Sequence, residues 1–150
     1  MSSVLDQLLD QRPLIAVMIS LVAAITAPLF SRHPNWREGC TLLAATLKLF
    51  VVASMLSAVL AGETPSSASL LLPQGLSLHL RADPLGLVFA LTAATLWVIT
   101  SLYSIGYMRA KDAPRQTGYY SAFALCLSAT TGLAFAGNLL TFFVFYEVLT

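Results

Sequence analysis

The chain has 150 residues, of which 57% are hydrophobic and only 10% are charged. Soluble globular proteins carry roughly 25% charged residues, so this chain is too apolar to cover a water-soluble surface. Its formal net charge of +1 excludes the basic face with which proteins bind nucleic acid. The composition therefore predicts an all-α membrane protein whose surroundings are a lipid bilayer.

Four apolar runs approach the length of about 20 residues that a membrane-spanning helix needs. They cover residues 14–30, 40–61, 84–108 and 119–137, and an incomplete fifth run covers 138–150. The leader before the first run contains Asp6 and Asp10, which is unlike the positive start of a signal peptide, so we expect a retained helix. We predict four complete transmembrane helices plus a truncated fifth, with residues 1–150 forming the N-terminal part of one transmembrane domain.

The short loops indicate an orientation. The loops 31–39 and 109–118 hold five Lys or Arg residues, whereas the opposite side has only Arg12 and Arg81. Because cytoplasmic loops are enriched in positive charge, this asymmetry puts the N-terminus outside. We expect a multi-pass protein of the bacterial inner membrane.

Two further patterns concern the outer segment and the fourth run. Residues 76–81 alternate apolar and polar side chains, which predicts a short strand in a hairpin-like segment. The fourth run repeats a small residue every four positions, which favours close approach of a neighbouring helix. These small residues are Ala124, Ser128, Gly132 and Ala136.

Glu147 is the first candidate for chemistry. It lies about 14 Å along a helix from Asn138, near the middle of a hydrocarbon core of about 30 Å. A carboxylate at that depth costs at least ~2.5 kcal/mol on insertion scales and is usually paired and functional. We therefore predict that Glu147 exchanges protons; the alternative is a structural Glu satisfied by a hydrogen bond between helices.

Lys48 is the second candidate, because it is the one cation inside a predicted span. Its long stem allows it to extend toward the cytoplasmic surface, so a snorkelling side chain is one expectation. The other is that Lys48 lines a polar half-channel or faces Glu147, although a charged partner beyond residue 150 is also open. Both residues are predicted to belong to a proton-translocating path.

Other sites are excluded by residue type and spacing. His33 and His79 both fall in loops, which excludes a histidine pair holding haem inside the bilayer. The spacing of Cys40 and Cys126 suggests neither a disulfide framework nor a metal site, so we expect both to be packing residues. Asp83 before Pro84 is typical of a helix cap. The sequence has no phosphate loop, nucleophile elbow or metal-ligand spacing, so we expect no cofactor, no metal and no enzyme active site.

Three segments resemble one known family. They are Arg81-Ala-Asp-Pro-Leu-Gly86, Leu102-Tyr-Ser-Ile-Gly-Tyr-Met108 and Asn138-Leu-Leu-Thr-Phe-Phe-Val-Phe-Tyr-Glu147. They resemble the antiporter-like subunits shared by Mrp-type cation/proton antiporters and the membrane arm of respiratory complex I. The last segment looks closest to the D-type Mrp subunit. The likeness implies that Glu147 belongs to a proton path and pairs with a lysine on a later helix.

The resemblance also implies a function and partners. It favours a component of a proton-translocating or cation/proton antiport complex, with other membrane subunits as partners and protons, Na⁺ or K⁺ as cargo. The alternative is a membrane-arm subunit of an NADH–quinone oxidoreductase or a membrane-bound hydrogenase, in which other subunits perform the redox chemistry. A third alternative is a passive packing protein, in which a change at Glu147 harms assembly but not transport.

Overall fold

The computed structural model describes residues 11–67, 70–71, 77–111 and 116–150. Most of the leader, with Asp6 and Asp10, lies outside the described residues, as does Arg115 of the second short loop. Part of the segment between residues 67 and 77, including Leu76, lies outside them as well.

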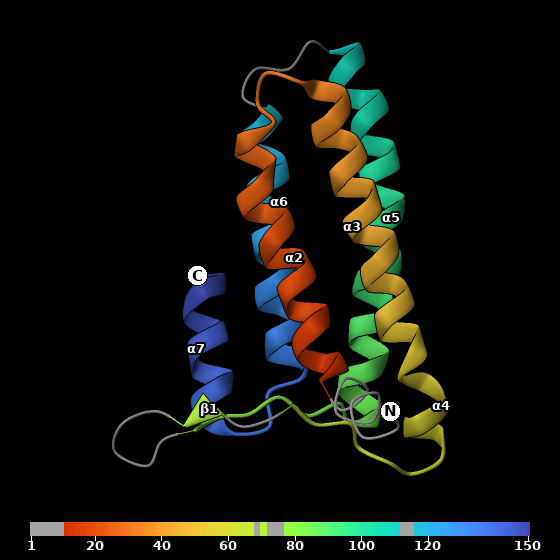
Figure 1. Cartoon of the computed structure of the whole chain (residues 1–150), viewed down its shortest axis with the longest axis vertical. Coiled ribbons are helices and arrows are strands. Elements are labelled where there is room, and N and C mark those ends of the chain that lie inside the picture. The colour runs from red at the N-terminus through yellow and green to blue at the C-terminus, as the bar shows by residue number, and fades with distance from the viewer. Residues whose placement is uncertain (1–10, 68–69, 72–76, 112–115) are drawn as a thin grey trace, which may run out of the picture.

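Four long helices stand side by side in a ring (Figure 1). They are α2 (Arg12–Leu29), α3 (Pro34–Ser54), α5 (Pro84–Ala110) and α6 (Gln116–Ala134). Each contacts its two neighbours in the order α2, α3, α5, α6 and back to α2. Because α2 and α5 run opposite to α3 and α6, residues near the start of α3 lie beside the end of α5.

The helix bounds agree with the predicted runs in part. Three helical stretches are long and apolar enough to cross a membrane, namely Arg12–Leu29, Pro34–Leu60 and Pro84–Ala110. The second begins at Pro34 rather than at residue 40, because proline fits the first helical turn. It has a break at Met55, after which the short helix α4 (Leu56–Leu60) continues.

The bundle has the polarity of a membrane protein. Large apolar side chains face outward on every long helix, including Ile25 on α2, Phe50 on α3 and Phe89 on α5. The interior instead contains small and polar side chains, which include Ser20, Thr41, Lys48, Ser101, Ser104, Ser128 and Thr131. An apolar exterior around a partly polar interior is expected for a bundle in lipid, where helices associate through small residues and hydrogen bonds. The chain is a multi-pass membrane protein.

One end of the bundle is closed by an extended segment. The strands β1 (Leu70–Leu71) and β2 (Ser77–Leu78) pair antiparallel, so the predicted hairpin is present but has only two residues in each strand. The chain after β2 then pairs with the α6–α7 connection, since Arg81 N–H donates to Phe135 O and Gly137 N–H donates to His79 O. As predicted, Asp83 caps α5 by accepting from Gly86 N–H at 2.8 Å.

Helix α7 (Leu139–Leu149) packs beside α6 and reaches only part of the way along the bundle (Figure 1). Asn138 caps it, since its Oδ1 accepts from Thr141 N–H at 2.8 Å. The amide of Asn138 also donates to Ser77 O at 2.6 Å, so the same residue ties α7 to the hairpin. At 11 residues α7 is shorter than a full span.

Candidate functional site

Lys48 lies at the centre of the four-helix ring. Its side chain is fully buried, with no surface exposed to solvent. On α3 it follows Arg37, Thr41 and Ala45 along the same buried face, at the spacing of successive helical turns. The stem of Lys48 therefore points into the bundle, and the ammonium meets side chains from the other three long helices.

Three hydrogen bonds hold the ammonium. Its Nζ donates to Ser20 Oγ of α2 at 2.7 Å and to Thr131 Oγ1 of α6 at 2.6 Å. The third bond, of 3.1 Å, goes to the backbone carbonyl of Leu127. Because an ammonium has three donors, every one of them is matched.

The fourth wall of the site is aromatic. The Nζ of Lys48 lies 5.3 Å from the ring centroid of Trp97 on α5, within the range of a cation–π contact. Trp97 is itself fully buried. The partners of Lys48 are thus two hydroxyls, a carbonyl and an indole face, all of them neutral.

The surrounding helices are built for this close approach. Helix α6 binds α2 through two serine hydroxyls, since Ser128 donates to Val17 O at 3.0 Å and Ser121 donates to Ala24 O at 2.7 Å. Ala124 and Ser128 of the predicted small-residue stripe are buried. Thr131 Oγ1 donates to Leu127 O at 2.7 Å, which leaves its lone pairs to accept from Lys48.

These contacts correct two expectations for Lys48. The snorkelling side chain is wrong, because the ammonium is enclosed by four helices and does not reach the surface. The contact with Glu147 is also absent from the structure, since the three donors of Lys48 are used by Ser20, Thr131 and Leu127. The sequence pattern that would have indicated an inward-facing Lys48 is the spacing of three or four residues between Arg37, Thr41, Ala45 and Lys48.

Glu147 lies in the last turn of α7, and its side chain is exposed on the surface of the described bundle. Phe142 and Tyr146 stack on the same helix with ring centroids 6.4 Å apart, and both are exposed. Within the described parts of the chain, no hydrogen bond or ion pair reaches the Glu147 carboxylate. The polar neighbour expected for it therefore stays a prediction.

A second polar cluster lies where α3 begins and α5 ends. The sequence analysis counts its two arginines as loop charges and does not predict the role of its glutamate. The Glu38 side chain is 4% exposed and binds Arg109, whose side chain is 53% exposed, through a bidentate ion pair. Arg37 is buried and donates to Thr117 Oγ1 at 2.9 Å and to Gln116 Oε1 at 2.8 Å. We refer to Arg37, Glu38 and Arg109 as the charged cluster.

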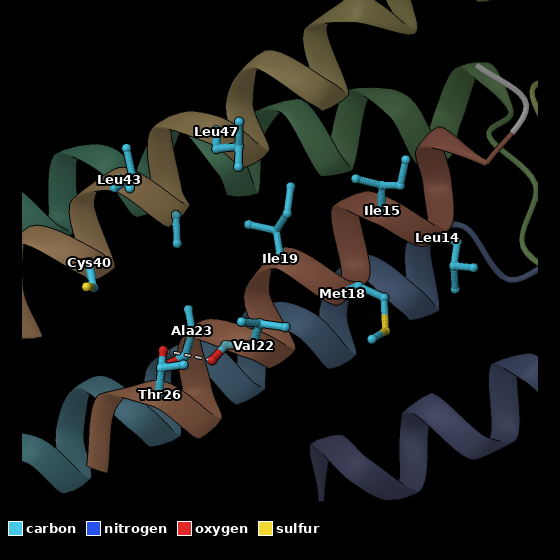
Figure 2. Close-up of a pocket in the computed structure, with 11 residues that line it drawn as sticks. Leu14, Ile15, Met18, Ile19, Val22, Ala23, Thr26, Cys40, Leu43 and Leu47 are labelled. Atoms are coloured by element: carbon cyan, nitrogen blue, oxygen red, sulfur yellow. Dashed lines mark hydrogen bonds between the residues drawn. The ribbon is translucent and has the colours of Figure 1, made fainter. Parts of the chain in front are cut away.

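One apolar surface groove shows no chemistry of this kind. The groove between α2 and α3 is lined almost entirely by apolar side chains, and Figure 2 shows Ile19 of α2 pointing toward α3 across it. Its one hydroxyl, on Thr26, donates back to the carbonyl of Val22 at 2.9 Å. Over the described residues, no group of three His, Cys, Asp or Glu side chains is placed to hold a metal ion.

Comparisons with known proteins give relatives and a shared fold. No family model matches the chain. The chain is 26% identical over 138 residues to the Na⁺/H⁺ antiporter subunit A1 of Staphylococcus aureus, which covers 89% of this chain and 17% of that protein. The same subunit from the strains JH9 and Newman matches equally. The chain thus spans about a sixth of the length of these relatives.

A solved structure has the same arrangement of helices. It is the structure of the membrane-bound sulfane sulfur reductase, an archaeal respiratory membrane complex, in which one chain matches with a TM-score of 0.76 and 19% identity over 90% of this chain and 21% of that one. The resemblance to a D-type subunit stays a prediction, since the relatives above are A1 subunits. Over most of its length the chain is thus similar in sequence to an antiporter subunit, and it shares its fold with a chain of a respiratory membrane complex.

Proposed function

We propose that this chain is part of a membrane complex that translocates protons or exchanges cations for protons, and that Lys48 is a proton-carrying group in it. The observation that carries the proposal is a fully buried lysine whose partners are all neutral. Charged residues inside membrane bundles are costly and rarely serve packing alone. A buried lysine also changes its protonation state more readily than arginine, which stays charged.

The partners suit either protonation state. As an ammonium, Lys48 donates to Ser20, Thr131 and Leu127 O, as in the structure. As a neutral amine, Lys48 has two N–H donors and one lone pair. The hydroxyl of Ser20 can rotate so that it donates a hydrogen bond to that lone pair. No rearrangement of the helices is needed, so the site is able to gain and lose a proton without leaving a buried group unsatisfied.

Glu147 is the second proton-carrying group that we propose. The likeness to an antiporter subunit supports this role, as does a carboxylate on an aromatic helix surface, which is costly in lipid without a polar partner. Since Lys48 is occupied within the bundle, the partner of Glu147 comes from outside the described residues. The two groups would therefore act at separate places and not as a direct pair.

The proposal for Lys48 is tested by replacing it with methionine in the native complex, in membrane vesicles. We expect Lys48→Met to abolish cation-driven or respiration-driven proton movement at normal amounts of complex. The matched control is Lys111→Met, because Lys111 is an exposed lysine just after α5. Transport by Lys48→Met at the rate of the control would remove Lys48 from the mechanism.

Glu147 is tested in the same vesicles. Glu147→Gln keeps the shape and removes the proton site, so we expect transport to stop or to slow strongly. Glu63→Gln is the control, because Glu63 is exposed and lies outside the long helices. If Glu147→Gln lowers only the amount of complex and leaves the rate per complex unchanged, the role is structural, as in a passive packing protein.

The host complex and the membrane topology belong to the same proposal. The solved structure that shares the fold is of a respiratory membrane complex, so a redox host remains the second candidate. Proton movement driven by an electron donor and absent with a cation gradient alone would favour that host.

We propose an outside N-terminus, with α6 as a fourth span and α7 as the start of a fifth. Labelling of single cysteines placed at residues 33 and 63 would test this topology.

A further inference from the structure

We propose that Lys48 exchanges its proton through a buried, hydrated column that leads along the bundle to the charged cluster, and to one side of the membrane only. The column consists of Trp97, Ser101, Tyr120 and Arg37. This inference rests on the proposed function of Lys48 and names the route that serves it.

The order of these residues follows from contacts at both ends. At one end, Lys48 of α3 contacts Trp97 of α5 and Thr131 of α6. At the other end, Arg37 of α3 binds Thr117 of α6. Arg37 precedes Lys48 by eleven residues, which is about 16 Å along the helix. Because Ser101 follows Trp97 by one turn and Tyr120 follows Thr117 by one turn, both lie between the two ends.

Each residue of the column has a buried polar atom without a protein partner among the described residues. These atoms are Trp97 Nε1, Ser101 Oγ, Tyr120 OH and Arg37 Nε. All four side chains are at most 4% exposed. Buried polar groups are almost always hydrogen-bonded, and where protein does not supply the partner, ordered water does. Four such atoms in the interior between Lys48 and the charged cluster therefore indicate buried water molecules.

The buried side chains around the column are mostly small. The layer between Lys48 and Tyr120 is lined mainly by alanines from three helices, namely Ala23, Ala24, Ala45 and Ala124. On the other side of Lys48, toward the hairpin, the interior is a continuous apolar cluster that includes Val52, Met55, Leu87 and Phe135. Among the described residues, this apolar cluster has no buried polar atom without a hydrogen-bond partner. The hydrated route therefore leads from Lys48 toward the charged cluster and not toward the hairpin.

The charged cluster forms the mouth of the column. The guanidinium of Arg37 lies 5.2 Å from the ring centroid of Tyr120, and Glu38 and Arg109 pair beside it. Two guanidiniums against one carboxylate leave one net positive charge at the mouth.

The first test is water accessibility. In the native complex with Cys40→Ser and Cys126→Ser, Ser101→Cys should react with a small charged thiol reagent, because only a thiol in contact with water forms the reactive thiolate. Thr95→Cys is the control, since Thr95 is exposed on the outer face of α5 and should resist the reagent in lipid. Resistance of Ser101→Cys overturns the column, whatever Lys48→Met does to transport.

The second test is transport. The double variant Ser101→Ala, Tyr120→Phe removes two oxygens and should slow proton movement by at least about tenfold, because relayed proton transfer depends on positioned groups. The control is Thr95→Ala with Tyr103→Phe, both on exposed positions. A rate within twofold of the control overturns the column, and if Lys48→Met still blocks transport, the function of Lys48 stands without it. If the double variant fails to assemble, the labelling of Ser101→Cys decides.

Discussion

In the ion pair between Glu38 and Arg109, the glutamate is buried and the arginine is exposed. This difference predicts which of the two substitutions is the more destabilising. The Glu38 side chain is 4% exposed and the Arg109 side chain is 53% exposed. Removal of the arginine leaves a buried carboxylate without its cation, whereas removal of the glutamate leaves an arginine that can turn toward water. We therefore expect Arg109→Met to be clearly more destabilising than Glu38→Met.

The magnitudes follow from that difference. Breaking a fully buried pair costs about 3–5 kcal/mol. The loss in Arg109→Met should be smaller than that, because the arginine is exposed to solvent, which screens the pair. Glu38→Met should cost less than about 1 kcal/mol, since methionine fills the space with apolar atoms. The double variant should resemble Glu38→Met, so the coupling between the two sites should be about as large as the cost of Arg109→Met alone.

The assay is thermal unfolding of the native complex in detergent, followed by the loss of helical circular dichroism and by the amount of folded complex. The four proteins of the double-mutant cycle are compared in one buffer. Arg109→Met should have the lowest midpoint, and the second substitution should raise it again. Equal midpoints for the two single variants, or a double variant below both, would refute the reasoning from burial.

Three further predictions concern packing and caps. Gly86→Ala should be strongly destabilising, because a Cβ there would lie 2.2 Å from the carbonyl oxygen of Ala134. The control is Gly106→Ala, whose Cβ would meet no atom within 4 Å. It should be neutral or slightly stabilising in the same thermal assay. Lys48→Met should stop transport with little change in the thermal midpoint, because removal of a buried charge offsets the loss of its hydrogen bond to Ser20. Asn138→Ala should lower the midpoint by the equivalent of about 1 kcal/mol, and Asn138→Asp should recover the cap to Thr141 N–H but not the bond to Ser77 O.

The sequence predicted the helices well because lipid leaves few alternatives. An apolar run of sufficient length in a bilayer must satisfy its own backbone, so the runs at 14–30 and 84–108 correspond closely to α2 and α5. The helix α3 begins six residues before the predicted run, which excluded Arg37 because it counted that residue as a loop charge. Here the helix extends past its apolar run, and its charged residue Glu38 is paired with Arg109.

The site was predicted only in part, for a physical reason. Hydropathy identifies a charge inside a span but not the direction in which its side chain points. The role of Lys48 in proton transfer stays a prediction. Its partners Ser20, Trp97 and Thr131 come from three other helices, and a single sequence does not specify which helix faces are neighbours. The face of α3 that joins Arg37, Thr41, Ala45 and Lys48 was present in the sequence and would have indicated an inward lysine.

The way in which Lys48 is held favours one mode of proton movement over another. A lysine that swings between two sides of a membrane must break its hydrogen bonds on one side and reform them on the other. All three donors of Lys48 are bound, by groups on two helices, and the indole of Trp97 covers the ammonium. Moving it would leave Ser20 unsatisfied in an apolar interior and would cost about 1–3 kcal/mol for that buried group alone. The arrangement is therefore better suited to a stationary lysine that receives and releases protons through hydroxyls and water than to one that carries them by moving.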